Sequence, residues 1–460
     1  MVKNVVFIVV DCMRADHLGF NGYNKKLTPF LDKLAKEGMN FTHAFSNGPF
    51  SPASYVSMFT SATSLDYLSH SKYPKEATNI AEVLKNKGWT TVGFNKNAWC
   101  SKFFGYDVGF DHYDDFMLGE EKKEKNIFGK IEYSLQTKFG QNSKFVSVFR
   151  RIEYFKKTFN PDKELFEASE VNKKVFNWLD NNHKEDNFKK FFMWLVYMDV
   201  HPPYYPPQKF INFVNPEITK RNKQWLNSCT SEQMSKKDRE KYHNLFEANL
   251  MYMDSEIKKV YEKLEKLGIL KDTMIIIAAD HGFEFWEHNW LGMKAKMYEE
   301  NIRVPLIIWN GGVKGSTDKL VTLRDIPATI CDVFGVEHKF LSNNNLLKYK
   351  GEEYIYSECS YNPLRGPIYV GDEEKYRENI IYCIRSKRYK YIYDEGNKKE
   401  EFYDLEEDKD EKVNLIENGT VEIDVFRKLL KARKDKIFNQ MKVKEFEKDI
   451  EEDIIDELEV

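Results

Sequence analysis

Long apolar segments are missing from this chain of 460 residues. Near its start the longest apolar run covers residues 5–10, whereas a helix that spans a bilayer needs roughly 20 apolar residues. The opening residues also lack the basic, apolar and small-residue pattern of a secretory signal. We therefore expect a cytoplasmic protein with no transmembrane segment.

Cysteine is scarce and the net charge is small. The six cysteines are scattered and form no CxxC pair, which disfavours a disulfide framework and a zinc ribbon. Lysine and arginine total 70 against 73 aspartates and glutamates, so no broad basic surface for nucleic acid is expected. A chain of this length can bury a large core that carries an enzyme-sized cleft. We therefore expect an enzyme.

Apolar runs alternate with helical segments along the chain. Residues 5–10 form an unbroken apolar run that ends at Asp11, which is typical of a strand buried on both faces of a parallel sheet. Similar runs cover residues 90–94, 191–197, 274–279 and 306–309. Helices are predicted over residues 29–37 and 232–267, each followed by a glycine. The alternation predicts an α/β fold whose mostly parallel central sheet is sandwiched by helices.

Acidic and imidazole side chains follow two of the predicted strands. Asp11 ends the first apolar run, and Asp280 and His281 follow the run that ends at residue 279. Because the carboxyl ends of parallel strands share one sheet edge, these side chains are well placed to converge on one divalent metal. Calcium, manganese, magnesium and zinc all accept such ligands, with differing preference. Each aspartate taken alone also fits a helix cap or a turn.

Two further residues are candidates for catalysis. Ser51, followed by Pro52, is predicted to be the N-cap of a helix. A helix N-terminus also favours an anion, and a metal-bound serine oxygen loses its proton more readily and becomes a nucleophile. His201 lies in a proline-rich loop after the run 191–197, where it could protonate a leaving-group oxygen. The alternative for His201 is an ordinary loop histidine.

Seven segments of the chain, taken in order, resemble the motifs of the sulfatase family of the alkaline phosphatase superfamily, and the resemblance covers nearly the whole sequence. The segments are residues 9–19, 51–61, 88–91 with Lys96, 280–282, Lys294 with 298–300, 303–306, and 388–391 with 401–405. By this resemblance, residues 1–345 form a sulfatase-like catalytic α/β domain, 346–420 a smaller C-terminal α+β subdomain, and 421–460 a helical acidic tail. A variable insertion is expected at about residues 120–165, as a lid over the cleft or as an amphipathic surface helix.

The resemblance also implies roles for seven residues. Asp11, Asp280 and His281 would be metal ligands, and Ser51 would be the nucleophile. The remaining three would contact the ester: His201 and Lys294 at the ester and leaving group, and Lys96 at the oxyanion. Lys96 is the weaker match, because the family's nearby histidine is replaced by Ala98.

Three positions depart from the family pattern. The second acid of the family's paired aspartates is Cys12, which removes a hard ligand and would favour a softer metal such as zinc if its thiolate bound. The family's arginine is Tyr55, and its cysteine nucleophile is Ser51. Sulfatases oxidise that residue to formylglycine, whose hydrate releases sulfate. Ala53 fits the pattern that maturing enzymes accept, but Tyr55 breaks it, so formylglycine at Ser51 is an alternative that the sequence disfavours.

The residues and the resemblance predict a metal-dependent hydrolase with a covalent Ser51 intermediate. Its expected partner is a small-molecule or glycan sulfate or phosphate ester. Overall resemblance favours a sulfate ester, whereas the chemistry of an unmodified serine favours a phosphate ester. One alternative is a phosphoryl or phosphoglycerol transferase, because the reduced ligand set resembles the membrane-anchored lipoteichoic acid synthase branch. Another is a non-catalytic binding protein that keeps the fold, suggested by Cys12 and Tyr55.

Overall fold

The computed structural model describes residues 2–67, 72–116, 168–183, 190–348, 350–361 and 379–458. The insertion expected at about residues 120–165 lies outside these described residues. Among them, no helix is both long enough and apolar enough to cross a membrane.

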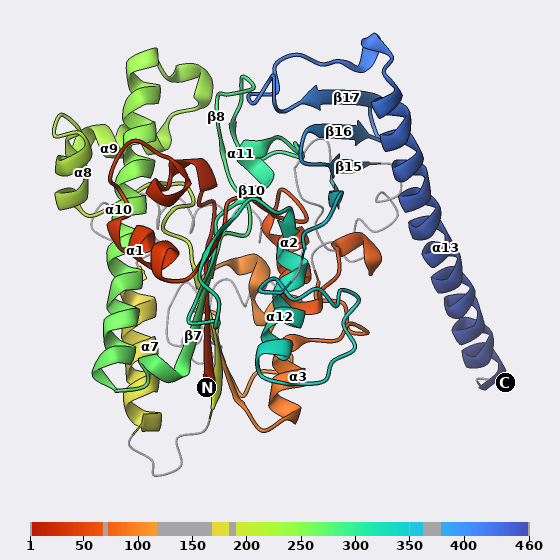
Figure 1. Cartoon of the computed structure of the whole chain (residues 1–460), viewed down its shortest axis with the longest axis horizontal. Helices are drawn as coiled ribbons and strands as arrows, with labels where there is room; N and C mark the ends of the chain where they lie inside the picture. The colour runs from red at the N-terminus through yellow and green to blue at the C-terminus, as the bar shows by residue number, and fades with distance from the viewer. Residues whose placement is uncertain are drawn as a thin grey trace, which may run out of the picture.

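An eight-stranded sheet forms the centre of the molecule (Figure 1). Its middle strand is β1 (Asn4–Val10), whose seven residues are all buried because both faces of the sheet are covered. Parallel neighbours flank it on both sides: β6 (Phe191–Tyr197) and β7 (Thr273–Ala278). Outward from β6 lie β4 (Thr90–Asn95) and β5 (His112–Asp114), and outward from β7 lie β11 (Leu306–Trp309), β2 (Met39–Phe41) and β12 (Gly315–Thr317). Only the pairs that β11 makes are antiparallel within this sheet as described.

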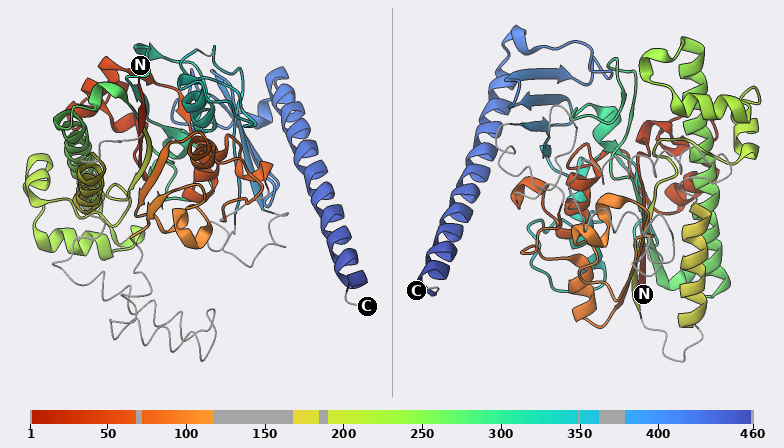
Figure 2. Two further views of the ribbon diagram at one scale, coloured as in Figure 1. Left: turned by 90° about the horizontal axis from the view of Figure 1, so that it is seen from below. Right: turned by 180° about the vertical axis from the view of Figure 1, so that it is seen from behind.

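Helices cover both faces of the sheet, as Figures 1 and 2 show. One layer holds α1 (Pro29–Glu37), α7 (Ala168–His183), α8 (Gln208–Val214), α9 (Lys220–Ser228) and α10 (Lys236–Lys266). The other holds α2 (Ser51–Thr60), α3 (Ile80–Asn86) and α12 (Ile326–Val333). Apolar side chains of both layers join the sheet in one core, which confirms the predicted α/β fold.

The helix predicted over residues 232–267 begins later in the structure. Ser231–Gln233 forms a separate turn of 3-10 helix. Ser235 then caps α10, because its side chain accepts the N–H of Asp238 while the Asp238 carboxylate accepts the N–H of Ser235. This reciprocal capping fixes the start of α10 at Lys236.

Three smaller sheets complete the described fold. Strands β3 (Ala44–Phe45), β10 (Arg303–Val304) and β13 (Val321–Thr322) form one, and a hairpin of β8 (Glu284–Phe285) and β9 (Leu291–Gly292) forms another. The short helix α11 (Glu299–Ile302) lies beside β10. The third sheet is antiparallel and contains β14 (Ile355–Ser360), β15 (Ile380–Arg385), β16 (Tyr389–Asp394) and β17 (Lys399–Asp404).

The C-terminal helix α13 (Val421–Leu458) packs its first turns on the antiparallel sheet and then extends past it (Figure 2). Ile423 and Phe426 share an apolar cluster with Phe402. Arg433 binds Asp66 at 2.8 Å and also pairs with Glu358. A buried ion-pair group therefore links α13 to Asp66, in the segment that follows α2, and to Glu358 in β14.

Candidate active site

The ends of β1 and β7 bring two acids and a histidine together. Val9 pairs with Ala278 in the sheet register, so Asp11 and Asp280 follow their strands at the same edge. Both carboxylates are fully buried, and His281 is 1% exposed. The His281 Nε2 atom lies 3.8 Å from Asp11 Oδ1 and 3.5 Å from Asp280 Oδ2.

Ser51 joins this group from the first turn of α2. Its predicted role as N-cap is wrong, because Phe50 occupies the cap position and Ser51 is the first helical residue. The hydroxyl is therefore not used to cap the helix. Its Oγ atom lies 3.3 Å from Asp11 Oδ2 and 3.2 Å from His281 Nε2. The positive end of the α2 dipole faces the same place.

Asn97 is a member of the site that the sequence analysis did not identify. Its Nδ2 atom donates to Asp11 Oδ2 at 2.6 Å and to Ser51 Oγ at 3.1 Å. Its Oδ1 atom accepts the N–H of Trp99. Asn97 follows β4 at the same sheet edge as Asp11, and that position was the signal that could have identified it.

The two predicted lysines make other contacts. Lys96 pairs with Glu170 on α7 at 2.5 Å and lies over the ring of Phe116. The Lys294 ammonium is 3.1 Å from the ring centroid of Trp290, and the residue is exposed. The structure describes no contact of either lysine with Ser51.

His201 and Cys12 lie beside Asp11. One possible ligand atom from each of these three residues lies within 4.8 Å of the others. The His201 Nδ1 atom donates to the carbonyl of Pro202 at 2.5 Å. Burial, and then the Asp11 and Asp280 carboxylates, raise the pKa of the Cys12 thiol well above its usual range. Without a bound cation, Cys12 is therefore a neutral thiol.

The buried carboxylates carry charge that the described side chains do not balance. Asp11 Oδ1 and Asp280 Oδ2 have no hydrogen-bond partner within the described chain. Burial, together with the nearby Asp11 carboxylate, raises the pKa of Asp280 to about 6. Burial lowers the pKa of His281, but the Asp280 and Asp11 carboxylates outweigh it and raise that pKa overall. Two free carboxylate oxygens and one imidazole nitrogen are a donor set that suits a divalent cation.

The backbone around Gly282 orients His281. The His281 Nδ1 atom is 2.8 Å from the Gly282 carbonyl oxygen. Because a carbonyl only accepts, the neutral ring carries its proton on Nδ1 and turns the Nε2 lone pair towards Ser51. A Cβ at residue 282 would lie 1.9 Å from the carbonyl oxygen of Glu300, so only glycine fits between this loop and α11.

Tyr55 lies at the position where the family has arginine. Its side chain is fully buried against Trp194 and Tyr106, and its hydroxyl has no hydrogen-bond partner in the described structure. Burial, and then the Asp280 and Asp11 carboxylates, raise the pKa of Tyr55, so the phenol is neutral. The site therefore lacks a fixed cation at this position.

Comparison with known proteins places these residues in context. A family model described as "Sulfatase" matches residues 3–336, and one described as "N-sulphoglucosamine sulphohydrolase, C-terminal" matches residues 286–440. An arylsulfatase of Clostridium perfringens is 25% identical, with 94% of each chain covered. Human arylsulfatase K is 23% identical over 90% of this chain and 78% of its own.

Solved structures share the fold at low sequence identity. One, solved with its substrate D-glucosamine-2-N,6-O-disulfate, has a TM-score of 0.71 and 18% identity, covering 95% of this chain and 99% of its own. The phosphonate monoester hydrolase of Agrobacterium radiobacter has a TM-score of 0.69 and 17% identity, covering 94% of this chain and 96% of its own. Fold neighbours therefore include proteins named for sulfate and for phosphonate esters.

Proposed function

Because this chain belongs to the sulfatase family of ester hydrolases, we propose that it cleaves sulfate or phosphate esters through a covalent intermediate on Ser51. The observation that carries the proposal is the position of the Ser51 Oγ atom. It lies 3.3 Å from Asp11, 3.2 Å from His281 and 3.1 Å from the Asn97 amide. A hydroxyl at a helix N-terminus, surrounded by such groups, suits attack on an anionic ester.

The proposed metal ligands are Asp11, Asp280 and His281, for one ion of calcium, magnesium, manganese or zinc. The orphaned oxygens Asp11 Oδ1 and Asp280 Oδ2 support this assignment. When bound, the ion would stabilise the Ser51 oxygen in its deprotonated form and offset the negative charge of the ester.

The chain's own groups then carry the reaction. Ser51 passes its proton to the Asp11 Oδ2 atom, which lies 3.3 Å from the hydroxyl, and forms the bond to sulfur or phosphorus. Asn97 fixes the position of the Ser51 hydroxyl relative to the Asp11 carboxylate, because its amide donates a hydrogen bond to each. The ester oxygen leaves with its electron pair and takes a proton from His201, which lies beside Asp11. Water then attacks the phosphorus or sulfur atom and gives a proton to His201. The Ser51 oxygen leaves with its electron pair and regains its proton from Asp11, and phosphate or sulfate is released.

The state of Ser51 separates the two substrate classes. An unmodified serine forms a phosphoester that water can hydrolyse at phosphorus, whereas formylglycine releases sulfate through its hydrate. Tyr55, which breaks the sequence pattern that maturing enzymes accept, supports an unmodified serine. Names of relatives and fold neighbours, including a sulfated glucosamine substrate, support a sulfate ester carried by a sugar.

Mass spectrometry of the Ser51 peptide, combined with a substrate panel, decides between these forms. A loss of about two mass units marks formylglycine and predicts turnover of nitrophenyl sulfate. An unchanged serine predicts turnover of nitrophenyl phosphate or a phosphonate monoester. Ser51→Ala must abolish either activity. If metal-loaded wild type hydrolyses none of these esters, a phosphoglycerol-type transferase or a non-catalytic binding role is favoured instead.

A further inference from the structure

A second group of possible metal ligands lies outside the Ser51 site. Its members are His288 in the β8–β9 hairpin, Glu300 on α11 and Glu411 in the loop after β17. One ligand atom from each lies within 4.8 Å of the others, and His288 Nε2 is 3.4 Å from Glu300 Oε1. We propose that these three residues bind a divalent cation of the zinc type, and that this ion fastens the C-terminal part of the chain to the catalytic part.

The three side chains are enclosed and aimed at one another. The side chain of His288 is 11% exposed, that of Glu300 is 8% exposed and that of Glu411 is 1% exposed. Within the described structure, neither His288 Nε2 nor Glu300 Oε1 has a hydrogen-bond partner. A buried polar atom without a hydrogen-bond partner lowers the stability of the folded state, and native structures provide a partner for nearly all such atoms. A cation between them would satisfy both.

The local charges leave one carboxylate uncompensated. Glu299 pairs with Arg385 at 2.9 Å and with Lys390 at 2.8 Å, and Glu411 shares Lys390 at 2.8 Å. Among the three carboxylates, Glu300 is the one that no described lysine or arginine pairs with.

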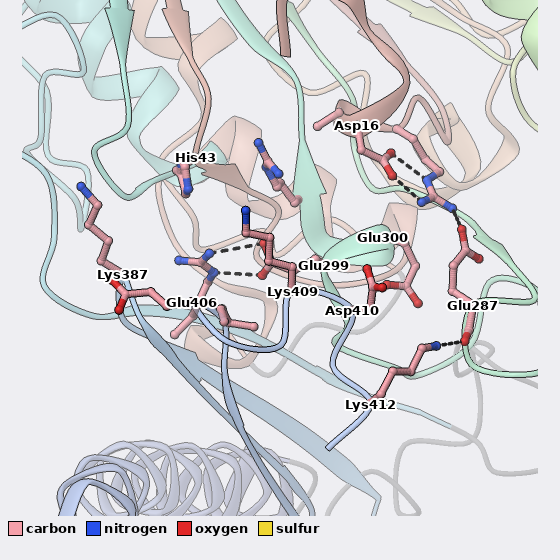
Figure 3. Close-up of a pocket in the computed structure, with 15 residues that line it drawn as sticks. Asp16, His43, Glu287, Glu299, Glu300, Lys387, Glu406, Lys409, Asp410 and Lys412 are labelled. Atoms are coloured by element: carbon pink, nitrogen blue, oxygen red, sulfur yellow. Dashed lines mark hydrogen bonds and ion pairs between the residues drawn. The ribbon is translucent and has the colours of Figure 1, made fainter. Parts of the chain in front are cut away.

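The ligand types indicate which ion fits. His288 supplies an imidazole nitrogen, and Glu300 and Glu411 supply carboxylate oxygens. One imidazole nitrogen with two carboxylates suits zinc, whereas calcium and magnesium prefer oxygen ligands. Glu300 also lines a pocket of about 820 Å³, which gives an ion a route from solvent (Figure 3).

The backbone of Glu300 connects this site to the loop that carries His281. The Glu300 carbonyl accepts the N–H of Phe283 at 3.0 Å, and the Asn301 carbonyl accepts the N–H of Gly282 at 2.8 Å. An ion that fixes Glu300 to Glu411 would therefore hold α11 against this loop. We expect the ion to contribute to stability and to the position of His281, without contacting the substrate.

Zinc content of the full-length protein tests the proposal. Each protein is loaded with zinc, passed through a desalting column and analysed for metal per chain. Glu300→Gln, which keeps the shape of the side chain, should bind one equivalent less than wild type, or bind it at least tenfold more weakly. Glu401→Gln is the matched control. That carboxylate is also buried, but Lys399, Tyr298 and Tyr403 already pair with it, so zinc content should stay at the wild-type value.

The opposite result has a clear physical meaning. If Glu300→Gln and wild type bind equal amounts of zinc, the proposal is wrong, and a protonated Glu300 donates to His288 instead. If Glu300→Gln fails to fold, the zinc content of Asp280→Ala provides a second test. This variant lacks a ligand of the Ser51 site, so retention of one equivalent supports the second site and complete loss of zinc contradicts it. Neither readout uses activity, so the result is independent of the proposed reaction.

Discussion

Asn97 should matter for catalysis beyond its part in the fold. Its amide makes two hydrogen bonds, one to the Asp11 carboxylate and one to the Ser51 hydroxyl. Loss of a hydrogen bond to a charged group costs about 1.5–3 kcal/mol. Each 1.4 kcal/mol is about a tenfold change in rate. If the bonds are made in the transition state, removing the amide should lower kcat/KM by roughly 10- to 100-fold.

Two substitutions separate catalysis from folding, because Asn97 also caps a short helical turn by accepting the N–H of Trp99. Asn97→Ala removes both functions, whereas Asn97→Ser keeps a capping oxygen and loses the amide. We expect Asn97→Ser to melt near the wild-type temperature while kcat/KM for a nitrophenyl ester falls as above. Asn97→Ala should show the same loss of activity and a lower Tm. Wild-type kcat/KM in a folded Asn97→Ser variant would refute the reasoning.

Three further predictions concern the surroundings of the site. Gly282→Ala should lower the free energy of unfolding by about 1–3 kcal/mol and reduce kcat/KM, because the new Cβ would lie 1.9 Å from a carbonyl oxygen of α11; an unchanged Tm would count against this close approach. Burial raises the pKa of Asp66, but Arg433 outweighs it and holds that pKa at about 2, against 3.8 for an ordinary aspartate. Stability from this pair, about 2 kcal/mol, is present above about pH 4 and lost as the pH falls towards 2. Urea unfolding at several pH values should show this loss in wild type, and Asp66→Asn should not show it. Asp280→Ala should bind one equivalent of metal less than wild type and lose activity, and His281→Ala should weaken binding at the Ser51 site by about one to two orders of magnitude; elemental analysis that finds the wild-type metal content in Asp280→Ala would contradict the ligand set.

Strand ends were the most informative feature of the sequence. The unbroken apolar runs before Asp11 and Asp280 identified two parallel neighbours, and adjacent parallel strands bring their carboxyl ends to one edge. The sequence could therefore predict that these acids lie together. Ser51 was found as a candidate, but its local role was misassigned. Proline is common after an N-cap residue and also after the first residue of a helix. The proline at position 52 therefore does not decide which of these two positions Ser51 occupies.

Other parts of the structure depend on side-chain direction or on distant segments. Lys96 and Asn97 are neighbours after β4, yet Asn97 contacts Ser51 while Lys96 pairs with α7. A motif match alone could not decide between them. His288, Glu300 and Glu411 come from a hairpin, a short helix and a loop, with no spacing typical of a metal site. Only the tertiary structure brings these three residues together.

The central claim is that Ser51 forms a covalent ester with the substrate, and rapid acid quenching tests it most directly. Metal-loaded enzyme is mixed with excess nitrophenyl phosphate or nitrophenyl sulfate, quenched within the first turnovers, digested and analysed by mass spectrometry. The Ser51 peptide should gain about 80 mass units, the mass of a phosphoryl or sulfuryl group, relative to the free enzyme. Ser51→Ala should show neither the gain nor turnover. Full turnover by Ser51→Ala, or the added group on another residue, would contradict the account.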